Sequence, residues 1–468
     1  MNATGRPSTR RPVDQIVVQR VSIQFTFTGM KRIHPLACLM ILVVLLVHEK
    51  TFAQDKSANN AIDSSRLYEL FNLARQSSRQ EQYETAKKYL DTALMIAPDF
   101  STIHFAHLKY CLRTGKKEEA LSEIDLLLQH RALKVQEIKT DSLVLAELAT
   151  NPRFKSALAK LDLFLKPVGN VSVAYTLEDK AQLPEGITND PVTKTIYLSS
   201  IYQRKVVSIE RNGKINDFIR SKQDDVLGVV GLAIDAKKRI LYLCSSFTPQ
   251  NIIKDTGDIK DKHTAVYAYD LKTGSFLHKY SHPDASFFND LTVAPGGDVY
   301  VSDSDGNMVY RIRIADNVME PFITRPVLFG ANGICFDDTG KNLYAAAYLG
   351  GVLKVNIASG IKTWISKPSG ISMAGIDGME WYKNSLIVNS PTEHKAIRRL
   401  YLNNDQTAVI KEEIIAYDPE TINETTTGTI IGNVFYFIKN SGLDNFEQDG
   451  HLNFEKLLRP VIGKCILK

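Results

Sequence analysis

From about residue 166 onward, the chain alternates apolar and polar positions in short runs that Gly, Asp and Asn interrupt, which is typical of strands and turns. Six segments align on one position, and each leads into an alternating run, a turn and a second alternating run. The aligned positions lie 45, 59, 43, 45 and 50 residues apart and are Gly186, Gly231, Asp290, Gly333, Gly378 and Gly428. Repeats of about 40–50 residues that hold several short strands are the signature of propeller blades. The pattern predicts a mainly β protein with a six-bladed β-propeller over residues 166–468, in which residues 171–175 complete the blade formed by residues 460–467.

Residues 60–165 carry a helical pattern, rich in Leu, Ala, Glu, Lys and Gln and almost without Gly. The spacing of apolar residues at 83–94 recurs 34 residues later at 117–128, which is the period of tetratricopeptide repeats. Small residues at Ala86 and Ala120 would let two helices approach closely. The sequence therefore predicts a tetratricopeptide-like helical module over residues 54–165, with a plain helical bundle as the alternative. Such a module would bind a protein partner, which the sequence does not name.

Residues 1–53 resemble a leader with a secretory signal. Lys31 and Arg32 precede an apolar run at 36–47, and small residues at Thr51 and Ala53 would form a cleavage site. A run of twelve residues is too short to span a bilayer, which takes about 20 residues. The leader predicts export to the periplasm or the medium with no stable membrane span after cleavage, and an uncleaved anchor is the alternative. Met30 is the better placed start, which puts the translation of residues 1–29 in question.

The formal net charge of +5 would suggest a nucleic-acid partner, but the excess of basic residues lies in one segment of the chain. Residues 1–53 contain seven basic and two acidic side chains, so the remaining chain holds 50 of each sign. A neutral mature protein has no long-range field to attract a polyanion, and we expect no nucleic-acid partner. Beyond the leader the chain has the cysteines Cys111, Cys244, Cys335 and Cys465, which are widely spaced. We expect them to be mostly buried free thiols.

One position in each blade carries the candidate chemistry, namely the residue just before the aligned one. In blade order these residues are Glu185, Val230, Asn289, Asn332, Asp377 and Thr427. Equivalent positions of equivalent blades lie at one height around the axis, so two carboxylates and two amides should point toward a common centre. Unpaired polar groups that converge in this way are costly unless water or a metal satisfies them. All-oxygen ligands suit Ca²⁺ or another divalent cation, whereas a zinc site would contain imidazole or thiolate.

These motifs resemble the gluconolactonase-like family of the senescence marker protein type, whose six-bladed propeller is shared with paraoxonases, diisopropylfluorophosphatase and strictosidine synthase. The matching segments are 184–186, 288–290, 331–333 and 376–378, and the resemblance covers residues 170–468. It implies that Glu185, Asn332 and Asp377 bind a divalent metal, with Asn289 as a fourth ligand or a substrate contact. It further implies hydrolysis of lactones or related esters, in which the metal polarises the carbonyl and Asp377 is the general base or nucleophile.

The chain departs from the family pattern at two positions. Gluconolactonase-type members have an Arg two residues before the Asn of blade three, where this chain has Phe287, followed by Phe288. Paraoxonases have a His before the aligned position of blade two, where this chain has Val230. A less polar substrate than a sugar lactone is therefore expected, and a non-catalytic binding propeller with a structural metal is the alternative.

Phe287, Phe288, Tyr348 and His394 are the candidate substrate contacts at the mouth of the propeller. Asp303 ends a predicted strand there and is a further candidate. A surface-loop histidine, a core tyrosine and a turn aspartate are the alternative interpretations of His394, Tyr348 and Asp303.

Overall fold

The computed structural model describes residues 64–247, 259, 261–325, 327–447 and 450–468. The predicted leader, with its apolar run and the proposed start at Met30, lies outside the described residues. None of the helices in the described ranges is long and apolar enough to cross a membrane.

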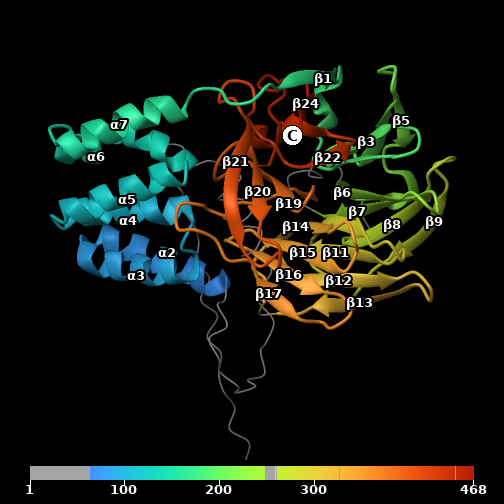
Figure 1. The fold of residues 1–468 in the computed structure, drawn as a ribbon, viewed down its shortest axis with the longest axis horizontal. Coiled ribbons are helices and arrows are strands. Elements are labelled where there is room, and N and C mark those ends of the chain that lie inside the picture. The colour runs from blue at the N-terminus through green and yellow to red at the C-terminus, as the bar shows by residue number, and fades with distance from the viewer. Residues whose placement is uncertain (1–63, 248–258, 260, 326, 448–449) are drawn as a thin grey trace, which may run out of the picture. The chain divides into compact units, whose positions relative to one another are not determined.

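Six antiparallel sheets of four strands each follow the helices along the chain (Figure 1). Blades one to three consist of β2 (Ile187–Asn189), β3 (Ile196–Ser200), β4 (Lys205–Ile209) and β5 (Ile215–Ile219); β6 (Gly228–Asp235), β7 (Ile240–Ser246), β8 (Ala265–Asp270) and β9 (Phe276–Tyr280); and β10 (Phe288–Val293), β11 (Val299–Asp303), β12 (Met308–Arg313) and β13 (Val318–Ile323). Blades four to six consist of β14 (Ala331–Phe336), β15 (Asn342–Ala347), β16 (Val352–Asn356) and β17 (Lys362–Trp364); β18 (Met379–Trp381), β19 (Ser385–Ser390), β20 (Ala396–Leu402) and β21 (Val409–Tyr417); and β22 (Gly428–Ile431), β23 (Val434–Asn440), β24 (Val461–Ile466) and β1 (Ser172–Thr176).

The sheets close into a ring, and the six-bladed propeller predicted from the repeat is confirmed. The first strands of successive blades contact one another all the way round, from β2 through β6, β10, β14, β18 and β22 back to β2. Strand β1 pairs antiparallel with β24, so the start of the propeller completes its last blade as predicted (Figure 1). This pairing gives blade six its fourth strand and joins the two ends of the propeller, so that the ring is closed by hydrogen bonds.

Strands in the second position of the blades are largely buried on both faces because the blades stack face to face. All residues of β3, β11 and β19 are buried, which explains why these runs look continuously apolar with interspersed Ser. Aromatic rings fill the space between blades, as where Tyr300 meets Phe322 and Phe336 edge to face.

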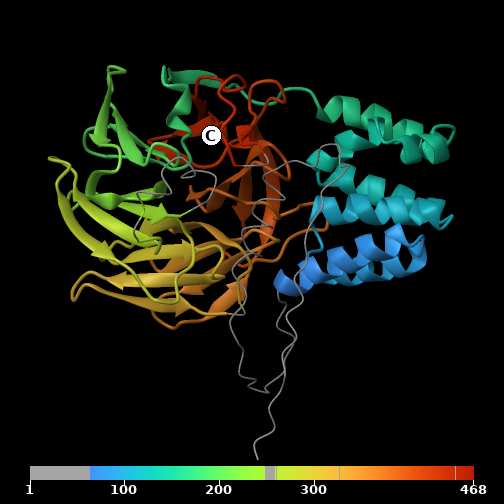
Figure 2. The same ribbon diagram turned by 180° about the vertical axis from the view of Figure 1, so that it is seen from behind.

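The helices before the propeller are stacked in chain order, as Figures 1 and 2 show from opposite sides. They are α2 (Ser64–Arg79), α3 (Tyr83–Ile96), α4 (Ser101–Arg113), α5 (Lys117–Gln129), the 3₁₀ segment η1 (Leu133–Lys139), α6 (Ser142–Leu148) and α7 (Pro152–Phe164). The predicted N-terminal helices are therefore confirmed, whereas their relation to tetratricopeptide repeats stays a prediction.

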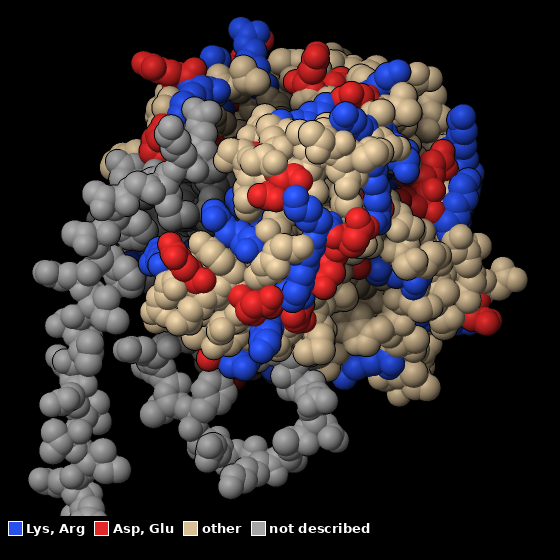
Figure 3. Space-filling view, turned by 90° about the vertical axis from the view of Figure 1, so that its left-hand side faces the viewer, with Lys and Arg blue, Asp and Glu red and all other residues tan. Residues whose placement is uncertain are grey.

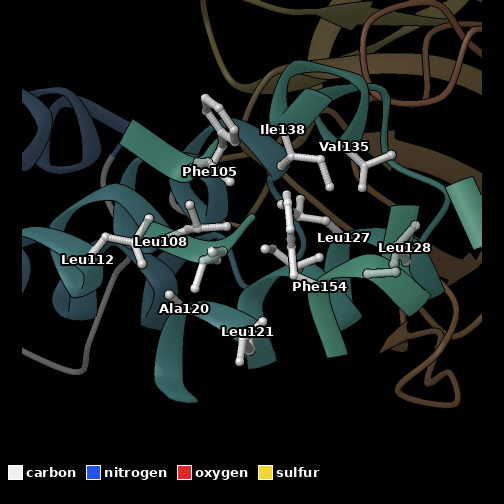
Figure 4. Close-up of a cluster of buried hydrophobic side chains, with 14 of the residues drawn as sticks. Phe105, Leu108, Leu112, Ala120, Leu121, Leu127, Leu128, Val135, Ile138 and Phe154 are labelled. Atoms are coloured by element: carbon white, nitrogen blue, oxygen red, sulfur yellow. The ribbon is translucent and has the colours of Figure 1, made fainter. Parts of the chain in front are cut away.

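The helical core matches the periodicity that predicted it. Ala86 and Ala120 are completely buried, as expected for positions where helices approach closely. Leu108, Leu127 and Phe154 point into a shared cluster between α4, α5 and α7 (Figure 4). Helix α7 begins at Pro152, and the side chain of Asn151 caps it by accepting the N–H groups of Arg153 and Phe154.

Charges are mixed on the surface. On the face shown in Figure 3, basic and acidic side chains are interspersed over the described residues. This agrees with the balanced charge of the chain beyond its leader. Cys111, Cys244, Cys335 and Cys465 are buried and free of disulfides, as predicted.

Candidate functional site

The aligned glycines bring neighbouring blades close together at the axis. A Cβ atom on Gly333 would lie 2.4 Å from the carbonyl oxygen of Asp377, and one on Gly378 would lie 2.7 Å from the Cα atom of Thr427. The same relation joins Gly186 to Val230 and Gly231 to Asn289. Four of the six aligned residues thus face the residue of the next blade that stands just before its own aligned position. The position that the sequence singled out therefore forms a continuous ring around the axis.

Blades six and one close this ring through hydrogen bonds. The hydroxyl groups of Thr426 and Thr427 donate to the carbonyl oxygen of Glu185 at 2.7 and 2.6 Å. Opposite them, the side-chain amide of Asn289 donates to Ser304 Oγ at 3.0 Å, and Ser304 Oγ donates to the carbonyl oxygen of Ala331 at 2.6 Å. The bonds of Ser304 tie the ring to the loop that follows β11.

Glu185, Asn332 and Asp377 are buried and close enough to influence one another. Burial and, after it, the nearby carboxylates of Asp377 and Asp290 raise the pKa of Glu185 well above its ordinary value. Burial raises the pKa of Asp377 to about 7, and an interaction with Asn332 partly offsets this rise. Two carboxyl groups therefore share a site in which their ionised forms are disfavoured.

Two polar atoms of this site are unsatisfied. Oε2 of Glu185 and Nδ2 of Asn332 are buried and have no hydrogen-bond partner among the described residues. Buried polar atoms are rarely left unpaired in native proteins. Oε2 of Glu185 therefore calls for a bound water or cation, whereas Nδ2 of Asn332, an N–H donor, calls for a water or another acceptor. A hard divalent cation fits the oxygen atoms of this set, since the two carboxylates would supply charge and Asn289 and Asn332 would supply amide oxygens.

The amides would be essential to such a site. Within the described ranges, no group of three or more His, Cys, Asp and Glu side chains could hold a metal ion. Glu185 and Asp377 alone therefore do not make a metal centre of the usual kind. A cation bound here would depend on Asn289 and Asn332 as well.

A polar channel continues along the axis beside the ring, with a volume of about 260 Å³. The first strands line it, and it contains the carboxyl groups of Asp290 and Glu380. Burial raises the pKa of Asp290 to about 7 and that of Glu380 to about 8, in the second case with a contribution from Asp290. Sequence reasoning noted Asp290 only as a replacement for glycine and missed Glu380. The signal for Glu380 was its place two residues after an aligned glycine, on a first strand.

The structure places two of the predicted mouth residues in structural roles. Phe288 is completely buried and packs edge to face on Tyr310, so it lies in the core between blades and does not line an opening. Asp303 is also completely buried and accepts the N–H groups of Ser286, Phe287 and Gly306. It holds a turn together, which was the alternative interpretation. Phe287 is half-buried against the same core.

Tyr348 lies near the axial site but under the helices. It is 9% exposed, and its ring belongs to a hydrophobic cluster with α2, α3 and α4. Its hydroxyl hydrogen-bonds with Thr392, and burial raises its pKa, with a smaller contribution from Asp377. The alternative interpretation of Tyr348, a core tyrosine, therefore fits better than a substrate contact at the mouth.

His394 is not on a surface loop, and that interpretation is wrong. It is 4% exposed and lines a small cavity of about 30 Å³ between blade five and the ends of α5 and α7. Neither ring nitrogen has a partner in hydrogen-bond geometry within the described part of the chain, and burial lowers the pKa of the imidazole. The helices that cover His394 are distant in sequence, so the local pattern could not predict its burial.

No family model matches the chain. No curated protein matches it at a significant level. Similar solved structures include a gluconolactonase from Xanthomonas campestris, 14% identical with a TM-score of 0.43 over 65% of this chain and 99% of that one. They also include an inactive virginiamycin B lyase from Staphylococcus aureus with quinupristin, 14% identical with a TM-score of 0.43 over 64% of this chain and 99% of that one. A third is an aldose sugar dehydrogenase from Streptomyces coelicolor with bound PQQ, 13% identical with a TM-score of 0.43 over 64% and 99%. Similarity at this level leaves the chemistry of this chain to be argued from its own site.

Proposed function

We propose that the protein is a divalent-cation-dependent hydrolase of lactones or related esters, with Ca²⁺ as the expected ion. The observation that carries the proposal is the axial set itself. Glu185 has a buried carboxylate oxygen with no partner among the described residues, and its carboxyl lies close to that of Asp377, which interacts with Asn332. The motif resemblance of these segments to gluconolactonase-like propellers supports the choice of reaction.

Each ligand residue would have a distinct task. Glu185, Asn289 and Asn332 would hold the cation, and the hydrogen bonds of Thr426 and Thr427 to Glu185 would fix the ring around it. A bound divalent cation supplies a Lewis acid that polarises an ester carbonyl and stabilises the developing negative charge. Asp377 would accept a proton from the attacking water or attack the carbonyl itself.

The substrate would be less polar than a sugar lactone. Phe287 stands where gluconolactonase-type members have an Arg, and it is half-buried rather than fully in the core. The balanced surface charge gives no reason to expect nucleic acid as a partner.

Export supports the choice of Ca²⁺. The predicted leader would deliver the protein to the periplasm or the medium, and extracellular Ca²⁺ modules typically bind at about 10⁻⁴–10⁻³ M. We therefore expect a site of modest affinity that fills outside the cytoplasm.

A non-catalytic binding propeller with a structural cation is the second candidate. It is favoured by the burial of Phe288, Tyr348 and His394, because three of the four predicted substrate contacts do not present an open surface. In that case the helical module would bind a protein partner.

The test compares wild-type protein with Asp377→Ala on a panel of lactones and aryl esters, with Ca²⁺ or with EDTA. Turnover that requires both Asp377 and the cation supports the hydrolase. Val230→Ala, at the same ring position of blade two without any ligand atom, is the matched control and should retain turnover. A wild type that hydrolyses nothing while Ca²⁺ still raises its Tm favours the binding protein.

A further inference from the structure

The segment that leads into Asp377 is held by the helical module. This segment, residues 373–377, connects blades four and five and is called the connector below. The turn between α3 and α4, residues 97–100, contacts it directly. The N–H group of Met373 donates to Oδ2 of Asp99 at 3.2 Å, and Oδ1 of Asp99 pairs with Lys367 at 2.9 Å. The next connector residue, Ala374, is completely buried in one hydrophobic cluster with Ala97, Phe100 and Ile103.

In a second contact the helical module is the donor and a residue of the propeller, before the third strand of blade five, is the acceptor. The N–H group of Ser101, the first residue of α4, donates to Oε2 of Glu393 at 2.9 Å. Helix α4 has no side-chain cap of its own and no acidic residue in its first turn. A helix N-terminus needs acceptors for its free N–H groups, and here a propeller residue that is 2% exposed supplies one.

The side chain of Glu393 also lies against the connector. A Cβ atom on Gly375 would be 2.5 Å from Cγ of Glu393, and Gly375 has a φ of +66° that favours glycine. The N–H of Gly375 donates to the carbonyl of Tyr348 at 2.8 Å, and the N–H of Asp377 donates to that of Asn389 at 2.8 Å. Glu393 therefore contacts both the N-terminus of α4 and the backbone two residues before Asp377.

The α3–α4 turn is itself braced from within the helical module. Nε2 of His104 lies 2.7 Å from the carbonyl oxygen of Pro98, and Nδ1 lies 2.6 Å from Glu123 on α5. Since both ring nitrogens face acceptors, His104 acts as a double donor that joins the turn to α5. These two contacts therefore tie the turn to α5 within the module.

We infer that the helical module positions the axial site. Glu393 and Asp99 link the helices to the connector and thereby hold Asp377 in its place on the ring. The inference rests on the proposed function for the role of Asp377. It gives the helices a task within this chain, in addition to any protein partner they bind. Glu393 and Asp99 are positioning residues, because neither belongs to the axial ring.

The experiment measures amide hydrogen exchange of residues 373–378 in the full chain, together with Ca²⁺ affinity by calorimetry. Glu393→Ala should speed exchange of the Gly375, Asp377 and Gly378 amides and weaken Ca²⁺ binding by about tenfold, within the 5–150-fold range typical of coupled sites. Glu393→Gln should restore both readouts, since its amide oxygen still accepts the N–H of Ser101. Asp99→Asn loses the ion pair with Lys367 and should show the same two effects to a smaller extent. It is the variant to measure if Glu393→Ala does not fold.

Asn151→Ala is the matched control, because it removes the N-cap of α7 in the same module without touching the connector. It should lower stability by about 1 kcal/mol and leave exchange of residues 373–378 unchanged. Unchanged exchange in both Glu393→Ala and Asp99→Asn would overturn the inference. If the wild type binds no Ca²⁺ and hydrolyses nothing, the proposed function fails, while the exchange comparison still decides whether the helices position the connector.

Discussion

Replacing Glu185 by Gln should change the stability of the protein in opposite directions with and without a divalent cation. Without a cation, Glu185 is a buried carboxyl with an unsatisfied oxygen beside Asp377, and its raised pKa means that its ionised form is disfavoured in the folded state. Glutamine has nearly the same shape, carries no charge and can donate to Asp377. The substitution should therefore stabilise the cation-free protein.

The expected change in Tm has two contributions, the relief of the unsatisfied carboxyl and the loss of Ca²⁺ binding. Relieving a buried unsatisfied group contributes about 1–2 kcal/mol, which raises the Tm of a folded unit of ~400 residues by about 1–2 °C. With free Ca²⁺ at about one hundred times its Kd, binding stabilises the wild type by about 2.7 kcal/mol, or ~3 °C at this size. The variant should lose most of that gain, so its Tm should exceed that of the wild type in EDTA and fall below it in Ca²⁺.

Scanning calorimetry of both proteins at pH 8, in EDTA and in a Ca²⁺ series, measures this crossing. Glu380→Gln is the matched control, because its carboxyl is also enclosed and has a raised pKa but lies in the channel outside the ring. It should gain stability in EDTA and keep the full response to Ca²⁺. A Glu185→Gln variant that responds to Ca²⁺ like the wild type would refute the assignment of Glu185 as a ligand.

Three further predictions concern the fold. Gly333→Ala should lower stability by more than about 2 kcal/mol in chemical unfolding, because its Cβ would lie 2.4 Å from a backbone carbonyl, whereas Gly296→Ala, with open space around it, should be nearly neutral. Burial lowers the pKa of His107, but Cys111 and Glu123 outweigh it and raise this pKa to about 10. The stability that His107 contributes should therefore be lost as the pH rises from about 6.5 through 10. His107→Gln should flatten that loss in urea titrations, and an equal loss in both proteins would contradict it. Cys111, Cys244, Cys335 and Cys465 should react with a thiol reagent only after unfolding, and fast labelling of the native protein would contradict their burial.

The propeller was predictable because its signal is repeated six times. Each blade contains the same alternation of apolar and polar positions, and five of the six have a glycine at the aligned position, so an error in one segment is corrected by the others. The axial ring was predictable for the same reason, since one equivalent position per blade has to meet its neighbours around the axis. The structure brings Glu185, Asn332 and Asp377 within electrostatic reach of one another, as that argument required.

The environment of the mouth was not predictable in this way. Tyr348 and His394 follow strand ends, where exposed loops are usual, yet helices more than two hundred residues away in sequence bury both. Phe288 and Asp303 are buried by the neighbouring turn and blade, which no local pattern specifies. Glu393 had no sequence signal at all, because its partner is a backbone N–H group of a distant helix.

By itself, the amino-acid sequence determined the repeating elements of this protein, their number and the polar residues around the axis, because hydrophobic period and turn residues act over a few positions of the chain. Only the tertiary structure decided which loop residues stay accessible and how the helices contact the connector beside Asp377. Burial and hydrogen bonding depend on what packs against a residue from elsewhere, and that information is distributed over the whole chain.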